Sequence, residues 1–362
     1  MASSPAMFFS CTTALLFMAL SSSNYLIFAN AKSPFRCNSG AAACTALVGY
    51  VPPNATTLSA VQTLFSIDNL STILGANNLP ISSPSNSPVP ANRSINIPFP
   101  CTCSNGTGLP SQPPIYTVVS GDGLYHIAAE VFSGLVTFQQ IQAYNRLPDA
   151  DNITVGQRLQ IPLPCSCDEV DGNQVLHYGH VVQSGSSLEG IAQQYNTSQA
   201  TLQKLNDLTD PRELVAGDVL DVPLRACSSA VKNTSQDYPL LVSNGTYLTT
   251  ASDCVVCECD ASISWKLQCK PSQNSSSHCI QPRCSNLILG NTTTSGCNRT
   301  TCAYAGFTNQ TIQTTLDSES ICPGSGNNGS SSAGSDRGGG CWRGWTEALL
   351  LIHLLLLCTC LV

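Results

Sequence analysis

Two short segments combine glycines, polar side chains and small apolar side chains in a pattern that suits a shallow ligand site. The first is the turn Gly121, Asp122, Gly123 and Leu124, and the second is the loop that contains Pro148, Asp149, Ala150, Asn152 and Ile153. Glycine lets backbone N–H and C=O groups approach a ligand closely. Ala150 and Ile153 add an apolar floor for a methyl group. This chemistry suits the hydroxyl and acetamido groups of an N-acetylated sugar.

The sequence around these segments predicts a small β-α-α-β unit. Ile115–Val119 is rich in strand-forming residues, and Asp122 is placed to cap a helix. Apolar side chains follow helical spacing in that helix: Leu124, Ile127, Ala128 and Val131. Thr137 is placed to cap a second helix that buries Ile141, and Arg158–Leu163 alternates as a strand. Because the two loops of such a unit leave it at the same end, we expect the two segments to face each other.

The same pattern recurs on both sides of this unit. His180–Leu224 repeats the polar turn, the two helical patterns and the closing strand, whereas Thr57–Phe65 begins an eroded copy that closes with SINIPF. The closing prolines, Pro98, Pro162 and Pro223, are spaced 64 and 61 residues apart. Three copies of one small domain are therefore predicted.

The flanking copies differ in what they offer a ligand. The third copy carries Ser184–Ser187 and Asp207–Asp210 at the equivalent loops, where a second sugar site and structural packing are equal alternatives. In the first copy, the proline-rich segment Ser82–Pro90 replaces a compact loop. The first copy is therefore expected to pack on its neighbours.

Composition and charge exclude several classes of function. Charged residues make up only 10% of the chain, against about 25% in average proteins, and the net charge is −7. A nucleic-acid partner is excluded because nothing here neutralises phosphates. The sequence has no G-x-S-x-G, H-E-x-x-H or phosphate-loop motif, so no enzyme, metal or cofactor is expected. Glycoside cleavage by paired carboxylates is kept as a minor alternative, and His126 is expected to be structural or exposed.

The cysteines indicate an oxidising compartment. Of the twenty cysteines, sixteen lie between Cys37 and Cys322, an even number that favours disulfides. The C-x-x-C pair Cys254/Cys257 would suggest zinc in a cytosolic chain, but disulfides are favoured here. In the pairs Cys101-Thr-Cys103 and Cys165-Ser-Cys167 each cysteine must bond elsewhere, because a ring between such close neighbours would be strained.

Thirteen N-x-S/T sequons agree with a secreted, glycosylated surface. Asn152 lies within the candidate loop, so its sequon is expected to be unoccupied or to carry a sugar that points away, and Asn328 lies near the C-terminus. The other sequons are predicted glycosylation sites: Asn54, Asn69, Asn92, Asn105, Asn196, Asn233, Asn244, Asn274, Asn291, Asn298 and Asn309.

The second and third copies resemble LysM domains. The shared features are the Y-x-V start, the turn Gly121–Leu124, the Ile–Ala pair, the asparagine after the second helix (Asn145, Asn206) and the ending V-G-Q-x-L-x-I-P. Three such units joined by C-x-C pairs resemble the ectodomains of plant LysM receptors. The runs LGANNLP, FSGLVTF and IPLPCSCD look closer still to the chitin-elicitor-binding proteins, which are LysM proteins on a glycosylphosphatidylinositol (GPI) anchor.

The resemblance implies an α+β architecture. Three LysM units, 37–100, 115–164 and 179–225, would be clamped by the disulfides Cys37–Cys103, Cys44–Cys167 and Cys101–Cys165, and a β-rich cysteine-rich domain would follow at 227–322. Short strands are predicted there at Pro239–Val242 and Thr246–Thr249. The resemblance also places an N-acetylglucosamine groove between the two candidate loops. Gly123 departs from the family pattern, in which threonine or serine is common.

The two ends of the chain read as targeting segments. Residues 1–31 form a predicted signal peptide with the cleavage motif Ala29-Asn30-Ala31. A Gly/Ser linker at 323–340 precedes an apolar tail at 341–362, which reads as a GPI signal with attachment at Ser332 or Gly334. The alternative is a short anchor that is left in place. No cytoplasmic segment is expected.

These features together predict a cell-surface receptor for chitin oligosaccharides. Without a cytoplasmic segment it would signal in innate immunity through a LysM receptor-kinase partner, and a long oligomer could bridge two copies into a homodimer. Two alternatives stay open. The ligand could be peptidoglycan, which also contains N-acetylglucosamine, or the protein could be a structural glycoprotein of the cell surface.

Overall fold

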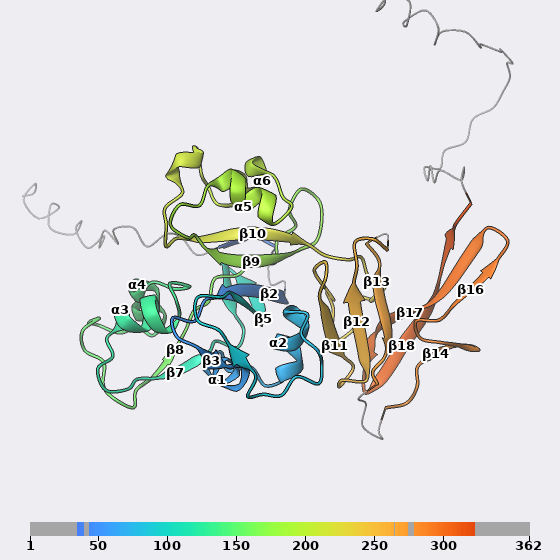
Figure 1. The fold of residues 1–362 in the computed structure, drawn as a ribbon, viewed down its shortest axis with the longest axis horizontal. Coiled ribbons are helices and arrows are strands. Elements are labelled where there is room, and N and C mark those ends of the chain that lie inside the picture. The colour runs from blue at the N-terminus through green and yellow to red at the C-terminus, as the bar shows by residue number, and fades with distance from the viewer. Residues whose placement is uncertain (1–34, 40–42, 264, 274–278, 323–362) are drawn as a thin grey trace, which may run out of the picture. The chain divides into compact units, whose positions relative to one another are not determined.

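The computed structural model describes residues 35–39, 43–263, 265–273 and 279–322 (Figure 1). The predicted signal peptide, Gly/Ser linker and GPI tail, with the attachment residues Ser332 and Gly334, lie outside the described residues, as do the sequons at Asn274 and Asn328. The described residues up to Glu319 form one compact unit. None of the described helices is long and apolar enough to cross a membrane.

The first unit has the predicted β-α-α-β order. Its main elements are β2 (Ala43–Tyr50), α1 (Leu58–Leu64), α2 (Leu70–Ala76) and β5 (Ile95–Ser104), with the short pair β3 (Thr56–Thr57) and β4 (Pro88–Val89). The side chains of Thr57 and Asn69 cap the two helices. Leu58, Ile73 and Ile97 are almost fully buried, which explains the helical and strand spacing of apolar residues in this segment.

The second unit consists of β7 (Ile115–Thr117), α3 (Leu124–His126), the π-helical turn η1 (Ile127–Val131), α4 (Phe138–Tyr144) and β8 (Arg158–Gln160). Thr137 caps α4 in a reciprocal pair with Gln140, and Ile141 is fully buried, as predicted. The predicted cap by Asp122 is wrong. Gly123 occupies the N-cap position without a side-chain bond, because the Asp122 carboxylate turns back toward β7.

The third unit repeats the order with β9 (Val175–Val181), α5 (Leu188–Gln194), α6 (Gln199–Leu205), the 3-10 turn η2 (Pro211–Glu213) and β10 (Val219–Arg225). Its first strand begins four residues before the predicted boundary at 179. Leu188, Ile191 and Ala192 are buried, in agreement with the helical spacing.

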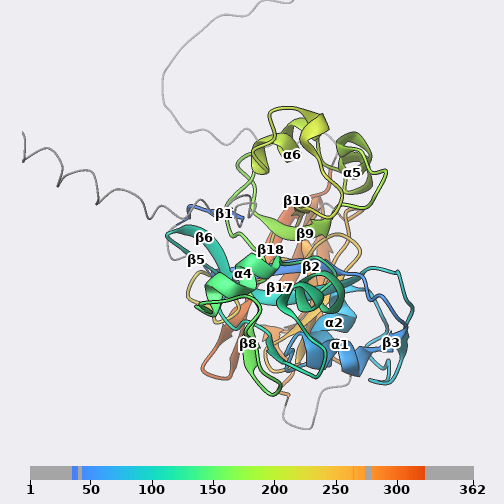
Figure 2. The ribbon, with the colours of Figure 1, turned by 90° about the vertical axis from the view of Figure 1, so that its left-hand side faces the viewer.

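One sheet joins the first and third units (Figures 1 and 2). Its strand order is β1-β6-β5-β2-β9-β10, where β1 is Arg36–Cys37 and β6 is Gly106–Pro110. The strands β2 and β9 run parallel at Leu47↔Tyr178, and the other neighbours are antiparallel. The second unit keeps β7 and β8 as a separate two-stranded antiparallel sheet. It joins the first unit through a shared core instead.

A chain of aromatic rings builds that shared core. Phe65 of the first unit lies edge-on to Tyr50 at 5.0 Å and to Phe132 of the second unit at 5.7 Å between ring centroids. Phe132 in turn lies 6.0 Å from Tyr116. Edge-to-face pairs of this kind stabilise a core beyond their buried area. The third unit has its own cluster, into which Leu47 of β2 reaches.

An asparagine after the second helix closes each unit in the same way. In the second unit, Asn145 Nδ2 donates to the carbonyls of Ile141 and Gln160 at 2.8 Å each, and its Oδ1 accepts the Gln160 N–H at 2.8 Å. Asn77 and Asn206 form the same three bonds in the first and third units. Asparagine supplies two donors and an acceptor on one short side chain, which explains why this residue type recurs.

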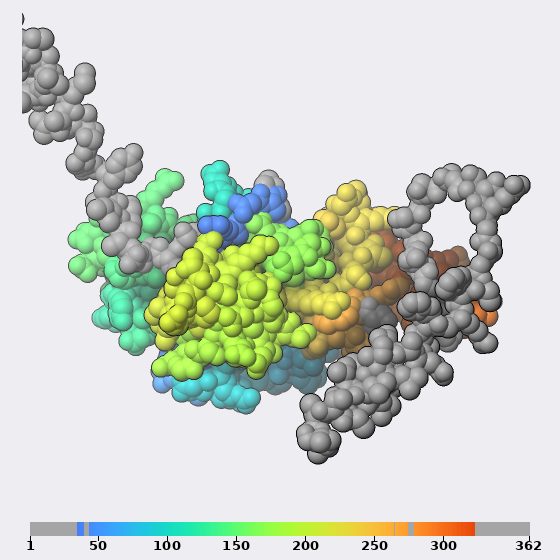
Figure 3. All heavy atoms as spheres, turned by 90° about the horizontal axis from the view of Figure 1, so that it is seen from above, coloured from blue at the N-terminus to red at the C-terminus, as the bar shows by residue number. Residues whose placement is uncertain are grey.

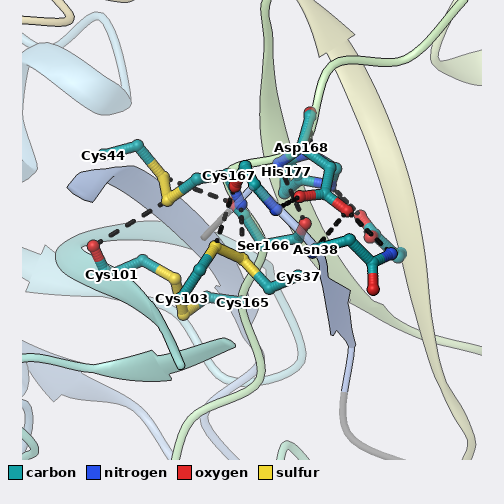
Figure 4. The surroundings of a disulfide bond; sticks show 12 residues. Cys37, Asn38, Cys44, Cys101, Cys103, Cys165, Ser166, Cys167, Asp168 and His177 are labelled. Carbon is teal, nitrogen blue, oxygen red and sulfur yellow. Dashed lines mark hydrogen bonds and ion pairs between the residues drawn. A yellow bond between two sulfur atoms is a disulfide. The ribbon is translucent and has the colours of Figure 1, made fainter. Parts of the chain in front are cut away.

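Disulfides clamp the three units at the C-x-C segments. The structure contains Cys37–Cys103, Cys44–Cys167 and Cys101–Cys165, the same three pairs that the family resemblance implies (Figure 4). All sixteen cysteines from Cys37 to Cys322 are disulfide-bonded. Two groups of three cysteine sulfurs lie within 4.8 Å of one another, but these sulfurs are disulfide-bonded and are not free thiolates for a metal ion.

The cysteine-rich domain is built from β-strands. The first three, β11 (Tyr247–Thr250), β12 (Val255–Cys259) and β13 (Leu267–Pro271), form one antiparallel sheet. The others are β14 (Arg283–Cys284), β15 (Leu287–Ile288), β16 (Thr292–Ser295), β17 (Asn298–Thr308) and β18 (Thr311–Ser320). The disulfides of the domain include Cys227–Cys259, Cys254–Cys279, Cys257–Cys269 and Cys284–Cys302, and Cys297 and Cys322 are disulfide-bonded as well.

Of the two short strands predicted in this domain, one is present. The strand predicted at Thr246–Thr249 corresponds to β11. The strand predicted at Pro239–Val242 is wrong, since no strand forms there. Pro239 has no N–H to donate to a ladder, and Leu240 and Val242 are buried as parts of an irregular segment.

Candidate functional site

The turn at Gly121–Leu124 presents its backbone to solvent. Gly121 has a φ of +94°, in the left-handed region that favours glycine, and a Cβ at Gly121 or Gly123 would meet no atom within 4 Å. Gly121 is exposed and Gly123 is half-buried. Leu124, by contrast, is 2% exposed and belongs to the core. The open part of the turn is therefore the backbone around the two glycines.

Asp122 organises the turn from beneath. One carboxylate oxygen accepts the Tyr116 hydroxyl and the Val119 N–H at 2.8 Å each, and the other contacts His126 Nδ1 at 2.9 Å. The side chain is only 1% exposed. Burial opposes its charge, but these hydrogen bonds outweigh burial and lower the pKa of Asp122. Burial, together with Asp122, raises the pKa of Tyr116 to about 12. Asp122 thus shapes the turn, and its oxygens already have partners.

The second loop supplies a polar edge over an apolar floor. Pro148, Asp149 and Asn152 are exposed, whereas Ala150 and Ile153 are half-buried and pack on the core shared by the first two units. Asp149 Oδ1 accepts the Asp151 N–H at 3.0 Å, which fixes the bend of the loop. The predicted floor residues are thus held in place from below.

Backbone bonds hold the two loops at the same end of the unit. The Val118 N–H donates to the Gln157 carbonyl at 2.9 Å, and the Gly156 N–H donates to the Val118 carbonyl at 2.8 Å. These bonds join the start of the glycine turn to the end of the second loop. The predicted site residues therefore divide into an exposed rim, a half-buried floor and the two inward residues Asp122 and Leu124.

Sequence reasoning missed three exposed apolar residues in and beside these loops. The exposed fractions are 54% for Val119, 70% for Tyr125 and 70% for Val155. Large apolar residues at loop and helix-start positions were the signal that could have found them. They add apolar surface to the end of the unit that carries both candidate loops.

The third unit uses its equivalent loops differently. Ser184–Ser187 is exposed, but the Ser187 hydroxyl accepts the Gly190 N–H at 3.1 Å and so caps α5. In the second loop, Arg212 pairs with Asp210 at 3.0 Å, and Thr209 bonds to Glu213. These side chains bind one another, so the third unit offers a charged loop that is already hydrogen-bonded.

The first unit covers its own helix start. The Leu58 N–H donates to the Ser87 carbonyl at 3.0 Å, and the Ser59 N–H donates to the Ser85 carbonyl at 2.7 Å. The proline-rich segment Ser82–Pro90 therefore occupies the backbone donors at the start of α1. This arrangement agrees with the expectation that the first unit is structural.

The sequon asparagines in the described residues are all exposed, as N-glycosylation requires. The predicted sites among them are Asn54, Asn69, Asn92, Asn105, Asn196, Asn233, Asn244, Asn291, Asn298 and Asn309. Asn152 is exposed as well, and it lies in the second candidate loop. Their occupancy stays a prediction.

Two family models match the chain. The LysM domain matches residues 180–223, and the LYK3/4/5 LysM2 domain matches residues 115–163. The chain is 42% identical to LysM domain-containing GPI-anchored protein 2 of Arabidopsis thaliana, over 98% of this chain and 99% of that protein. It is 38% identical to the chitin elicitor-binding protein of Oryza sativa subsp. japonica, with 88% of both chains covered. It is 27% identical to chitin elicitor receptor kinase 1 of Physcomitrium patens, over 52% of this chain and 28% of that protein.

The repeated β-α-α-β units, the asparagine that closes each of them and the two matched models define a protein assembled from LysM units. The similarity to relatives over nearly the full length is more specific. The chain belongs to the family of LysM domain-containing GPI-anchored proteins.

Proposed function

We propose that this protein is a cell-surface receptor that binds chitin oligosaccharides through its second LysM unit. One observation carries the proposal. The second unit combines an open glycine turn with an apolar floor of Ala150 and Ile153, whereas the equivalent loop of the third unit carries Arg212 and Asp210, which pair with each other. Backbone N–H and C=O groups at Gly121 and Gly123 would bind acetamido groups, and the floor would hold their methyl groups.

The named relatives support the ligand class. One relative is named a chitin elicitor-binding protein, and another is named a chitin elicitor receptor kinase. We therefore propose that the protein stands on the outer leaflet through a GPI anchor, signals through a LysM receptor-kinase partner, and forms a ligand-bridged homodimer on long oligomers. Its role would be the detection of chitin in innate immunity.

Three other functions make different predictions. Peptidoglycan shares N-acetylglucosamine with chitin, so soluble peptidoglycan would displace labelled chitin if it were the preferred ligand. A structural surface protein would bind neither polymer. A hydrolase would shorten the oligomers over time, and the buried, fully bonded Asp122 does not favour such a role.

The test is calorimetric titration of the secreted protein with N-acetylglucosamine oligomers of increasing length. The variant Ile153→Arg places a charge on the apolar floor. The matched control is Leu214→Arg, because Leu214 is the half-buried residue at the same position 61 residues later in the third unit. We expect length-dependent binding in the wild type and in Leu214→Arg, and at least a tenfold loss in Ile153→Arg.

Each other outcome contradicts the proposal at a defined point. If Leu214→Arg alone loses binding, the site lies in the third unit. Equal binding by both variants would exclude the floor as a contact. If the wild type binds no oligomer of any length, the chitin proposal fails, and direct titration with soluble peptidoglycan then separates a peptidoglycan receptor from a structural protein.

A further inference from the structure

The sequon at Asn69 lies where the first LysM unit meets the cysteine-rich domain. Asn69 Nδ2 donates to both carboxylate oxygens of Asp253 at 3.1 Å, across 184 residues of sequence. The hydroxyl of Ser71, the third residue of the sequon, lies 2.8 Å from Thr249 Oγ1 and 3.4 Å from Asp253 Oδ1. Both functional groups of this sequon therefore bind the cysteine-rich domain.

The surrounding contacts form a close-packed joint between α2 and β11. The Tyr247 hydroxyl donates to the Leu79 carbonyl at 2.7 Å. Gly75 faces the same strand so closely that an added Cβ would lie 2.2 Å from the Tyr247 carbonyl oxygen. A side chain at that position would push the two elements apart. In Figure 1, α2 lies beside β11, in agreement with these contacts.

The turn that presents Asp253 is strained. Ala251, Ser252 and Asp253 have φ values of 52°, 55° and 64°, so three consecutive residues that are not glycine adopt the left-handed conformation. Such runs are rare because the Cβ of each residue approaches its own backbone. The turn lies between β11 and Cys254, which is disulfide-bonded to Cys279. This strained turn fixes the Asp253 carboxylate in the position where it accepts the Asn69 side-chain amide.

A glycan on Asn69 would compete with the Asp253 carboxylate for the space beside Nδ2. N-glycosylation replaces one hydrogen of Nδ2 with a sugar ring, and the Asp253 oxygens lie 3.1 Å from that nitrogen. Asn69 Oδ1, which caps α2 by accepting the Ser71 N–H at 2.9 Å, would be unaffected. The glycan would therefore open the joint without unfolding the helix.

The order of synthesis places the glycan before the joint. Asp253 follows Asn69 by 184 residues, so it emerges about 10–40 s later at ~5–20 residues per second. The growing chain therefore presents Asn69 for glycan transfer before Asp253 has been made.

We propose that Asn69 is a modification-controlled joint, at which an N-glycan displaces Asp253 and releases the cysteine-rich domain from α2 of the first LysM unit. Molecules without this glycan hold the two domains together. Molecules with it carry the domain free of α2. Partial glycosylation of Asn69 thereby divides the secreted chains into two populations. This division does not depend on a sugar ligand in the second unit.

The experiment is hydrogen–deuterium exchange on full chains secreted from a glycosylating host, with occupancy at Asn69 measured by glycopeptide mass spectrometry. Amides of β11 and the following turn, residues 247–254, report on the joint. The matched pair is Ser71→Ala and Thr249→Ala. Both variants lose the hydroxyl contact between Ser71 and Thr249, but only Thr249→Ala keeps the sequon.

We expect two exchange populations in the wild type and in Thr249→Ala, with the fast fraction equal to the glycosylated fraction. Ser71→Ala should show the slow population alone, and Asp253→Ala in the Ser71→Ala background should show the fast population alone. Asn54→Gln, which removes a neighbouring sequon, should leave the wild-type pattern unchanged. Glycosylated molecules that exchange as slowly as Ser71→Ala would overturn the proposal. A wild type without any glycan at Asn69 would overturn it equally.

Discussion

The second and third LysM units share one fold but differ in the helix that follows the glycine turn and in the surface beside the candidate loops. In both units, the asparagine after the second helix (Asn145 or Asn206) bonds to the closing strand and forms an asparagine clasp. Both units also place a left-handed glycine in the first turn. In the second unit, however, the helix that follows the turn contains one extra residue. The Phe132 N–H donates to the Ile127 carbonyl five residues back, whereas Tyr195 donates to Ile191 four residues back. Single π-helical turns of this kind are frequent at functional sites.

The difference continues in the surrounding surface. The second unit exposes Val119 and Tyr125, where the third unit has Gln183 and Glu189 at the matching positions 64 residues later. Seen from the side of the third unit in Figure 3, that unit covers part of the first unit, and the second unit lies at its edge. The two units therefore share the asparagine clasp that closes the fold, whereas the residues of their loops differ.

The largest expected effect concerns how the second unit is attached. Replacing Cys101 and Cys165 together with alanine should lower the free energy of unfolding by about 2–5 kcal/mol, because this disulfide closes a long loop in the unfolded chain. Denaturant unfolding measures the loss. Sugar binding should weaken as well, since the second unit has no strand in the main sheet. Unchanged stability would mean that the shared aromatic core alone attaches the unit.

The asparagine clasps offer a matched test of the two units. Asn145→Asp and Asn206→Asp each remove both side-chain donors from a clasp, so the strand carbonyl of Gln160 or Asp221 loses its asparagine donor. The helix carbonyls of Ile141 and Leu202 still accept the backbone N–H of the substituted residue. Each substitution should cost about 1–3 kcal/mol, the usual range for removing one partner of a hydrogen bond. Only Asn145→Asp should also impair sugar binding. Equal loss of binding in both variants would show that the ligand site extends over both units.

A pH-dependent effect at neutral to alkaline pH is expected in the third unit. His177 is fully buried, with Nδ1 at 2.9 Å from the Asp221 carboxylate and Nε2 donating to the Asp168 carbonyl at 2.8 Å. Figure 4 shows His177 beside Asp168, whose carboxylate accepts the N–H groups of Asn38 and Ser39. Burial by itself lowers the pKa of His177, but Asp221 and Asp168 outweigh it and raise the pKa. Burial raises the pKa of Asp221 in turn.

The raised pKa of His177 determines the direction of this effect, because proton binding and folding are thermodynamically linked. Because the pKa of folded His177 lies above its unfolded value, its contribution to stability is fully present below the unfolded pKa and is lost as the pH rises through the folded pKa. The stability difference between the wild type and His177→Gln should therefore shrink from pH 6 to pH 9, as measured by denaturant unfolding. A difference that grows with pH would contradict the assignment.

The smallest expected effect comes from a substitution that makes the second unit more like the third. Gly123 is an N-cap in an extended conformation with open space around it, and Ser187 is the bonded cap at the matching position. Gly123→Ser should stabilise the fold by about 0.5–1 kcal/mol through the new cap and a less flexible unfolded chain. The reverse change, Ser187→Gly, should destabilise it slightly. A thermal melt of both variants measures these shifts, and a loss of stability in Gly123→Ser would show that the turn needs glycine.

The regular elements could be predicted because their signals are local. The spacing of Leu188, Ile191 and Ala192 marks a buried helix face, and Thr137 with Gln140 marks a helix start. The direction of the Asp122 side chain could not be predicted in this way. An aspartate before a helix favours a cap, but the Tyr116 hydroxyl and the Val119 N–H offered it partners in the opposite direction. The absence of a strand at Pro239–Val242 likewise reflects burial in an irregular segment.

The sequence by itself determined the three repeats, the even set of cysteines, the clasp asparagines and the positions of the candidate loops, because each depends on residue type and short spacing. Only the tertiary structure decided that the first and third units share a sheet, that the second joins through a core of aromatic rings, and that Asn69 meets Asp253. Such contacts join residues far apart in the chain. Their energy comes from packing and hydrogen bonds that exist only once the units are assembled.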